Sequence, residues 1–512
     1  RSFDGKSADA NKTLRVRSSD ISISTDEGSD FITVTDGSAK IETGRDDDVV
    51  HILGGTSHII STGGGEDAID IYQGSVGVFM GSGNDTANIL AGAVSIDAER
   101  GDDRINITGG VNTINTGEGL DNVIISGGTN TISTADDADT VSASDGTNTI
   151  NTGSGDDNIS LTGGVNFINA GIGDDIVNAS GGSSNIDIRS LVGGSGDDQL
   201  NIISTGTVTL PTFTEFENVL ISDTVHQSLN FSFSSTLTSI ELDSGTTIDG
   251  STITTTLGEG QSLTLDGITD GDMASASLSD GGIIIAQETS INLLELTLDD
   301  VGPATSTANE NVFIDIAGTG VSTAKITSGN DSFVVISNSG GALTGLELLG
   351  TGTMALGTLP TSITNVNGTG ASANLTLTIG SGTNTIRGGT GNDAITLTGG
   401  TNDVQTGDGD DIISTANNLV PGDRIDGGNG SDTFEVIHTG LATIPSTANL
   451  ISIENISIQD TVHQTLDFSM LTSITGIELD SGTTVDGAII DTTLGSGQSL
   501  KLDSITDGDT AA

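Results

Sequence analysis

Residues 152–169 read TGSGDDNISLTGGVNFIN, and this stretch decides the fold. It divides into two nines: the first has a glycine-rich acidic turn followed by Ile159, and the second has a glycine pair followed by Asn166 and Ile168. Short β-branched stretches with alternating inward and outward positions are typical of strands. The glycines before them permit positive φ and a tight reversal. Two strands and two turns therefore make one 18-residue coil.

The coil recurs along the chain in register. The aspartate that ends the acidic turn returns at a spacing of 18, then 19, then six times 18, and once more after a longer step of 23. These aspartates are Asp30, Asp48, Asp67, Asp85, Asp103, Asp121, Asp139, Asp157, Asp175 and Asp198. One coil cannot bury its own apolar face, whereas a stack can. The spacing therefore predicts an all-β protein, a parallel β-roll or β-solenoid with coils about 4.8 Å apart.

Stacking would bring the acidic turns together on one edge of the solenoid. Neighbouring aspartates then lie roughly 5 Å apart, where each like-charged pair repels by about 0.8 kcal/mol in bulk water and by more at a lower dielectric. The chain has 14 Lys and Arg against 70 Asp and Glu, so little counter-charge is present. Divalent cations between the turns would cancel the repulsion, and oxygen ligands without His or Cys favour Ca²⁺. We expect several calcium ions as the cofactor.

The acidic turns resemble the RTX nonapeptide GGxGxDxUx, the calcium-binding β-roll repeat of proteins exported by type I secretion. The best matches are TGSGDDNIS (152–160), AGIGDDIVN (170–178), GGSGDDQLN (193–201), GGTGNDAIT (388–396) and TGDGDDIIS (406–414). The resemblance implies that the sixth-position aspartate of each turn binds calcium. Less perfect turns, such as TADDAD (134–139), TGEGLD (116–121) and TGRDDD (43–48), lack some or all of the glycines.

The candidate metal ligands and turn glycines follow from the repeat and the resemblance together. The carboxylates are those of Asp30, Asp48, Asp67, Asp85, Asp103, Asp121, Asp139, Asp156, Asp157, Asp174, Asp175, Asp197, Asp198, Asp331, Asp393, Asp410, Asp411 and Asp432. The glycines are Gly153, Gly155, Gly171, Gly173, Gly194, Gly196, Gly389, Gly391, Gly407 and Gly409.

The opposite edge of the solenoid has a different pattern. Asn112, Asn130, Asn148 and Asn166 recur with the same period of 18, and the resembling family often has aspartate there. Stacked amides can hydrogen-bond one another as a ladder. We therefore expect calcium along one edge only and amides along the other.

A longer repeat is superimposed on the coils. FENVLISDTVHQSLNF (216–231) returns as IENISIQDTVHQTLDF (453–468), an offset of 237. This predicts two tandem 237-residue modules, the second one truncated, as if the chain were cut from a longer array. The expected segments are a basic N-terminal stretch (1–19), a calcium β-roll (20–205), a Thr/Ser-rich β segment (206–310), a second calcium-containing roll (311–435) and a second β segment (436–512). The β segments are expected either to continue the solenoid or to form a sandwich.

Composition limits the function. The net charge of −56 over 512 residues excludes binding of nucleic acid or an anionic membrane through basic patches. There is no cysteine, and no apolar run long enough for a helical membrane span. Neither a GxSxG nor an HExxH motif occurs, so we expect no enzyme activity in this chain.

The favoured interpretation is a secreted, extracellular structural protein of the bacterial cell surface that assembles with itself into an S-layer or filament once calcium folds it. RTX-type S-layer proteins are the nearest resemblance. Two alternatives stay open: the stalk of a secreted RTX adhesin, or the repeat region of an RTX enzyme with a catalytic domain elsewhere. A further hypothesis is that the basic stretch, with Arg1, Lys6, Lys12, Arg15 and Arg17, binds acidic surface polysaccharide.

Overall fold

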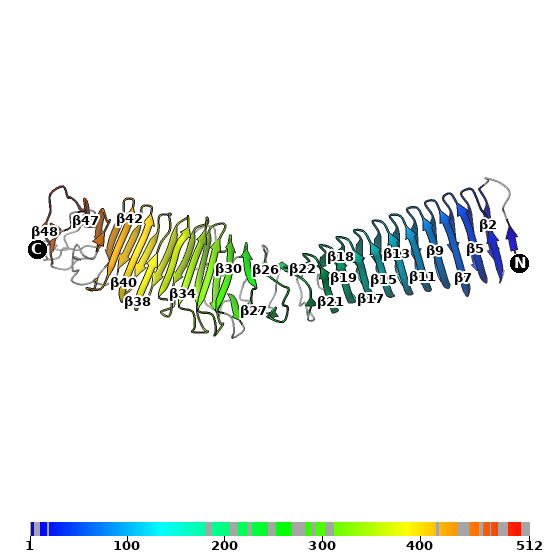
Figure 1. Cartoon of the computed structure of the whole chain (residues 1–512), viewed down its shortest axis with the longest axis horizontal. Coiled ribbons are helices and arrows are strands. Elements are labelled where there is room, and N and C mark those ends of the chain that lie inside the picture. Colours follow the sequence, from blue (N-terminus) through cyan, green and yellow to red (C-terminus); the bar gives the residue numbers. More distant parts are fainter. Residues whose placement is uncertain are drawn as a thin grey trace, which may run out of the picture. The chain divides into compact units, whose positions relative to one another are not determined.

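The structure is a computed structural model of the chain. It describes residues 2–4, 11–17, 20–180, 186–203, 213–222, 228–243, 252–268, 282–287, 292–302, 312–415, 419–437, 450–459, 464–469, 471, 473–479 and 490–502. Arg1 and Lys6 of the basic stretch lie outside the described residues. Every regular element within these ranges is a β-strand, and the strands pair in parallel. The expected parallel β-solenoid is thus confirmed, and Figure 1 shows its strands stacked side by side.

One coil shows how the sequence builds the fold. The long strand β17 (Thr147–Ser154) ends in the acidic turn, the short strand β18 (Asn158–Leu161) follows, and a glycine turn leads to the long strand β19 (Val165–Ile172). β17 pairs with β19 so that Ile150 lies beside Ile168 of the next coil. Alternate residues of both strands are buried. The 18-residue period of the sequence is therefore the pairing register.

The chain divides into two compact units, residues 1–225 with 233–240, and residues 226–232 with 241–512. The first unit contains two parallel sheets. One sheet contains β1 (Ser2–Asp4), β3 (Ile21–Ser24), β5 (Ser38–Arg45), β7 (Ser57–Gly64), β9 (Ser75–Ser82), β11 (Ala93–Arg100), β13 (Val111–Glu118), β15 (Thr129–Asp136), β17, β19, β21 (Asp187–Ser195) and β23 (Phe213–Thr214). The other sheet contains β2 (Thr13–Arg17), β4 (Phe31–Asp36), β6 (Val49–Ile52), β8 (Ala68–Ile71), β10 (Thr86–Ile89), β12 (Arg104–Ile107), β14 (Asn122–Ile125), β16 (Thr140–Ala143), β18, β20 (Ile176–Ala179), β22 (Gln199–Ile203) and β24 (Asn218–Ser222).

The second unit is also built of parallel strands. One sheet contains β25 (Ser228–Asn230), β27 (Thr252–Leu257), β29 (Gly282–Gln287), β31 (Val312–Ile316), β33 (Ser332–Ser337), β35 (Met354–Thr358), β37 (Leu375–Ile379), β39 (Ala394–Leu397), β41 (Ile412–Thr415), β43 (Thr433–Ile437), β45 (Asn455–Gln459), β47 (Gly476–Leu479) and β49 (Ser499–Leu502). The facing strands are β28 (Ser262–Asp266), β30 (Leu293–Asp299), β32 (Thr323–Ser328), β34 (Gly345–Gly350), β36 (Asn365–Ala371), β38 (Thr383–Arg387), β40 (Thr401–Asp408), β42 (Arg424–Asn429) and β44 (Leu450–Ile451). β46 (Gln464–Asp467) pairs with β48 (Ile490–Thr493), and β26 (Ser239–Leu242) spans the unit boundary.

The described strands of the Thr/Ser-rich segment 206–310 that lie in the second unit pair in the same parallel way. β27 pairs with β29, and β28 pairs with β30 without a register shift. A sandwich of the immunoglobulin type would need antiparallel sheets. These strands therefore have the pairing of a solenoid.

The core of the first unit is a stack of branched aliphatic side chains. Ile132 and Ile150 of the long strands and Val141 and Ile159 of the short strands are each at most 1% exposed. Burying a side chain of this size stabilises the fold by about 1.5–3 kcal/mol. Because each coil contributes the same few inward residues, the core is a continuous column, and the turns at its two edges are held in fixed register.

Candidate metal centre

The sixth-position aspartates of the acidic turns are buried at the edge of this core. Thirteen of them are at most 2% exposed: Asp30, Asp48, Asp67, Asp85, Asp103, Asp121, Asp139, Asp157, Asp175, Asp198, Asp393, Asp411 and Asp432. Alternation explains the burial, because Asp157 stands two positions before the inward-facing Ile159. The aspartates of neighbouring coils follow one another as two columns, one in each unit, which we call the aspartate ladders.

One oxygen of each ladder carboxylate binds the backbone of a neighbouring coil. The N–H of Asp103 donates to Oδ1 of Asp121 at 2.8 Å, and the N–H of Asp121 donates to Oδ1 of Asp139 at 2.8 Å. Corresponding bonds, between 2.7 and 2.9 Å, run through both ladders. Each carboxylate thus ties two coils together through a charge-assisted hydrogen bond.

The second oxygen is buried and has no hydrogen-bond partner. This holds for twelve Oδ2 atoms, those of Asp30, Asp48, Asp67, Asp85, Asp103, Asp121, Asp139, Asp157, Asp175, Asp198, Asp411 and Asp432. Threonine hydroxyls in some turns lie close to the ladder carboxylates but donate their hydrogen bonds to backbone carbonyls. Thr152 Oγ1, near Asp157, donates to the carbonyl of Ala170 at 2.7 Å. Asp393 differs, because its Oδ2 accepts the N–H of Gly389 at 3.1 Å.

Burial raises the pKa of most ladder carboxyls, including Asp85, Asp103 and Asp139. Loss of solvation raises the pKa of Asp103 to about 8, with a further contribution from the charges of Asp85 and Asp121. The pKa of Asp139 and that of Asp175 are raised to about 7 for the same main reason. A buried carboxylate oxygen that accepts no hydrogen bond is stabilised by a proton or a cation. The ladders are therefore suited to bind positive charge.

The other predicted carboxylates face solvent. Asp156 and Asp174 precede the ladder residues, and their hydrogen bonds run in the opposite direction: the N–H of Asp174 donates to Oδ1 of Asp156, and that of Asp197 donates to Oδ1 of Asp174, both at 2.9 Å. Asp410 likewise accepts the N–H of Ser431 at 2.8 Å. This exposed row lies next to the ladder in sequence but does not share its burial.

Asp331 also belongs with the exposed carboxylates. It accepts the N–H of Thr353 at 2.9 Å, and the following residue, Ser332, takes the buried position. The structure therefore places Asp331 outside the two aspartate ladders.

The turn glycines allow the coils to approach closely at the ladder. Gly155 has φ +136°, and a Cβ at this position would lie 2.0 Å from the carbonyl oxygen of Asp137 in the preceding coil. Left-handed φ values also occur at Gly153, Gly171, Gly173, Gly194, Gly196, Gly407 and Gly409. Gly389 and Gly391 lack a left-handed φ, yet an added Cβ would still clash with the backbone of Ala371 and Ala373.

Three residues that the motif did not identify stand at the ends of the ladders. Oε2 of Glu217 accepts the N–H of Asp198, and Oε2 of Glu454 accepts the N–H of Asp432, both at 2.9 Å. At the other end, the N–H of Lys12 donates to Oδ1 of Asp30 at 2.6 Å. The 237-residue repeat is the sequence feature that could have identified Glu217 and Glu454, because they occupy the same position in its two copies, FEN (216–218) and IEN (453–455).

The environment at the N-terminal end shows that the turn accommodates a positive charge. Lys12 Nζ donates to the carbonyl of Thr25 at 2.9 Å and to that of Glu27 at 3.4 Å, and lies 4.0 Å from Asp30 Oδ2. These three neighbours of the ammonium among the described residues are oxygens, the donor type that Ca²⁺ prefers. The residues of the ladder therefore fit a hard cation, with the Oδ2 atoms and turn carbonyls as its ligands.

The opposite edge has the predicted amide ladder. Nδ2 of Asn112, Asn130 and Asn148 each donates to Oδ1 of the next asparagine, at 2.7, 2.8 and 2.9 Å, ending at Asn166. The second proton of each amide goes to a carbonyl of the preceding turn, such as that of Gly127 for Asn130. These amides bond one another without a charge, which confirms the predicted ladder of stacked amides.

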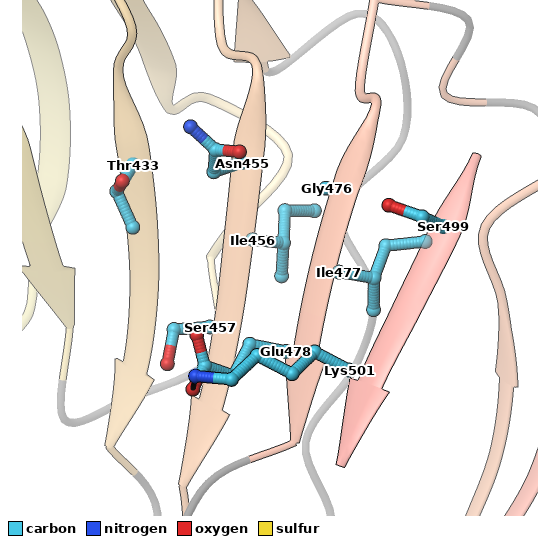
Figure 2. A pocket seen from close by; sticks show the side chains of 9 residues that line it. All are labelled: Thr433, Asn455, Ile456, Ser457, Gly476, Ile477, Glu478, Ser499 and Lys501. Carbon is cyan, nitrogen blue, oxygen red and sulfur yellow. Dashed lines mark hydrogen bonds and ion pairs between the residues drawn. The ribbon is translucent and has the colours of Figure 1, made fainter. Parts of the chain in front are cut away.

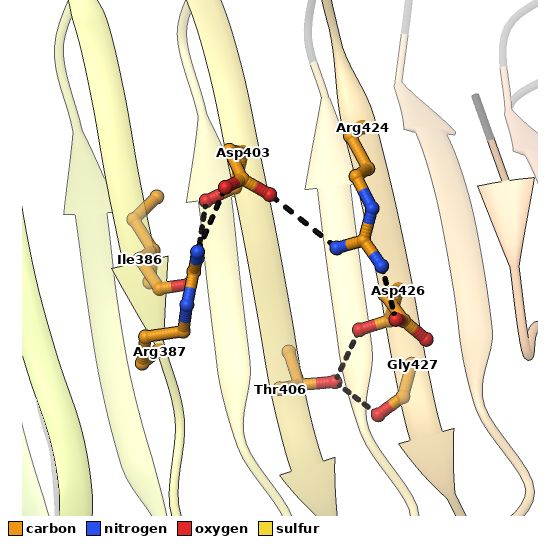
Figure 3. A network of polar contacts seen from close by, with 7 residues as sticks. All are labelled: Ile386, Arg387, Asp403, Thr406, Arg424, Asp426 and Gly427. Carbon is orange, nitrogen blue, oxygen red and sulfur yellow. Dashed lines mark hydrogen bonds and ion pairs between the residues drawn. The ribbon is translucent and has the colours of Figure 1, made fainter.

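Arginine does pair with aspartate elsewhere in the second unit. Asp403 pairs with Arg387 Nη2 at 2.7 Å and with Arg424 Nη1 at 3.4 Å, and Arg424 also pairs with Asp426 (Figure 3). The hydrogen bond from Arg387 lowers the pKa of Asp403, the reverse of the ladder aspartates. Asp403 thus has the positive partners that most ladder aspartates lack among the described residues.

Two smaller features lie in the second unit. Glu241, Asp243 and Asp266 each bring a carboxylate oxygen within 4.8 Å of the others, but they are only half-buried. A cavity of about 300 Å³ is lined by residues of β43, β45, β47 and β49, among them Gly476 and the ion pair of Glu478 with Lys501 at 2.7 Å. Figure 2 shows these lining side chains. Neither feature recurs from coil to coil as the ladder does.

Comparison of the chain with protein-family models, with curated proteins and with solved structures finds no match. Among the residues that the structure describes, no helix is long and apolar enough to cross a membrane. The geometry of the ladders is therefore the basis of the functional proposal.

Proposed function

We propose that this chain is a calcium-stabilised structural protein of the bacterial surface. The observation that carries the proposal is the row of twelve buried carboxylate oxygens that lack a hydrogen-bond partner. An unpaired buried charge is strongly destabilising, and a divalent cation between neighbouring coils removes that cost for two carboxylates at once. The resemblance of the turns to RTX repeats favours Ca²⁺ as the ion.

Calcium would couple folding to location. Ligand binding to the folded state alone stabilises it by mass action, so a chain with many such sites is most stable where calcium is abundant. Extracellular calcium sites in proteins have dissociation constants of about 10⁻⁴–10⁻³ M, which suits folding after export. Type I secretion, which the RTX resemblance implies, supplies such a route.

Assembly into an S-layer or filament is the function that best suits such a stack of repeats. The repeat gives regularly spaced surfaces, and the net charge of −56 keeps the chains apart until cations bind. Partners are other copies of the chain, with acidic surface polysaccharide as a second partner of the basic segment 1–19.

Negative-stain microscopy of the purified chain tests the assembly. Ordered sheets or fibres in millimolar calcium that dissolve with EGTA are the expected result, with magnesium as the control ion because it demands a smaller octahedral site. Monomers that are unchanged by calcium would contradict the assembly, and deletion of the basic segment without loss of cell attachment would contradict the polysaccharide contact.

A further inference from the structure

We propose that Lys12 is a built-in cation that closes the N-terminal end of the aspartate ladder in place of a metal ion. The position is set by the register. Counting back one 18-residue coil from Asp30 gives residue 12, where the ladder would otherwise continue with an aspartate. The backbone of Lys12 makes the ladder bond itself, since its N–H donates to Asp30 Oδ1 as the N–H of Asp30 donates to Asp48 Oδ1.

The side chain of Lys12 turns back into the coil that follows. Its ammonium donates to the carbonyls of Thr25 and Glu27 and lies 4.0 Å from Oδ2 of Asp30, the oxygen without a hydrogen-bond partner. The Lys12 side chain is 16% exposed and that of Asp30 is 0% exposed. Such a pair is screened by water far less than a surface ion pair.

The next coil shows which group binds the corresponding carbonyl there. There the carbonyl of Thr43 accepts the hydroxyl of Thr25 at 3.1 Å. At the first coil the equivalent carbonyl, that of Thr25, accepts Lys12 Nζ. Lys12 thus binds the corresponding carbonyl and brings a positive charge beside the buried carboxylate of Asp30.

Lys40, another lysine of the first unit, does not contact a ladder carboxylate in this way. Lys40 lies on the outer face of β5, where its side chain is 59% exposed and pairs with Glu42 at 2.6 Å. That partner is an exposed glutamate, not a ladder carboxylate. Lys40 therefore offers a matched control for the removal of a lysine from the same region.

Two consequences follow, the second of which rests on the proposed calcium function. Without metal, the first coils keep a neutralised carboxylate while later coils do not, so this end stays structured longest. Removal of the ammonium frees an oxygen-lined cation position, so the chain should take up one more calcium ion.

The experiment compares the full chain with Lys12→Met, Lys12→Arg and Lys40→Met. Hydrogen exchange in metal-free buffer at pH 7.5 is followed over β3 and β5, where Lys12→Met is expected to exchange at least about tenfold faster than the wild type. Calcium bound per chain is counted by equilibrium dialysis, and Lys12→Met is expected to bind one ion more. Lys12→Arg and Lys40→Met are expected to match the wild type in both measurements.

Each outcome decides the proposal. Exchange in Lys12→Met that equals that of Lys40→Met would overturn it, as would an unchanged calcium count. Lys12→Arg keeps the positive charge, so it still tests the proposal if Lys12→Met does not fold. A Lys12→Arg chain that behaves like Lys12→Met would also overturn the proposal. If the wild type binds no calcium, the proposed function fails, and the metal-free exchange comparison still decides the role of Lys12.

Discussion

Oδ1 of Asp121 accepts the backbone N–H of Asp103 at 2.8 Å, while Oδ2 of the same carboxylate is buried without a partner. The carboxylate therefore has two separable roles. One oxygen joins neighbouring coils in this structure, and we propose that the other binds a cation. Substitutions that preserve the first oxygen and alter the second can distinguish the two.

Asp103→Asn is such a substitution. The amide keeps an oxygen for the N–H of Asp85 and removes the negative charge that calcium would need. We expect the stabilisation by calcium to fall by about 1–3 kcal/mol, the scale of a charged hydrogen-bonding group. Thermal unfolding with and without calcium measures it.

Asp102→Asn is the control, because Asp102 is exposed and accepts the N–H of Leu120 at 2.9 Å. Its calcium response should equal that of the wild type. An equal loss in both variants would mean that the buried and exposed carboxylates contribute alike.

The stability of the metal-free chain should depend on pH. Burial raises the pKa from 3.8 to about 6 for Asp85, about 7 for Asp139 and about 8 for Asp103. The folded chain therefore holds more protons than the unfolded chain, and this contribution is complete below pH 3.8 and is lost as the pH rises through 6 to 8. The melting temperature in EGTA should fall between pH 5 and pH 8.5.

Calcium should reverse that trend, because the metal requires deprotonated ligands. A melting temperature in EGTA that rises over this range would show that the ladder carboxyls are not protonated in the folded chain.

The amide ladder should be insensitive to metal. Asn130→Ala leaves the amide of Asn112 without its acceptor and the carbonyl oxygen of Asn148 without its donor, in a buried position. We expect a loss of about 2–5 kcal/mol from two unsatisfied polar groups, equal with and without calcium.

Asn115→Ala provides the control, since this asparagine is exposed and bonds Asp97 at 3.0 Å. A loss below about 1 kcal/mol is expected for it. Chemical denaturation measures both variants, and a calcium-dependent loss at Asn130 would place metal at the amide edge.

Gly155→Ala tests the close approach of the coils. The new Cβ meets a backbone carbonyl at 2.0 Å in addition to a left-handed φ, so we expect a loss of more than about 3 kcal/mol. Gly341→Ala is the control, with φ +74° and no atom within 4 Å, where about 1–2 kcal/mol is expected from φ alone. Equal losses in urea denaturation would show that the contact between coils is unimportant.

Much of the fold could be predicted from the 18-residue period of the sequence. An 18-residue period with inward Ile and Val at fixed places has few structural solutions, so the register of Ile150 with Ile168 and the bonds between Asn130 and Asn148 were predictable from spacing alone. The alternation that buries Asp157 also turns Asp156 to solvent, and the acidic pair DD does not by itself reveal that difference.

The ends of the ladders were harder to predict. By charge, Lys12 belongs to the basic segment 1–19, and only its register with Asp30 shows that it occupies a ladder position. Glu217 follows Asp198, and Glu454 follows Asp432, at spacings of 19 and 22, outside the regular period of the coils. The direction of the inter-coil hydrogen bonds depends on backbone orientation, which composition and spacing do not contain.

Calcium titration of the metal-stripped chain at pH 8, by calorimetry with circular dichroism in parallel, tests the central proposal most directly. We predict uptake of several ions with dissociation constants of about 10⁻⁴–10⁻³ M, together with a gain in β-sheet signal and melting temperature that magnesium does not reproduce. No binding heat at millimolar calcium, with the same β-sheet signal in EGTA, would contradict it.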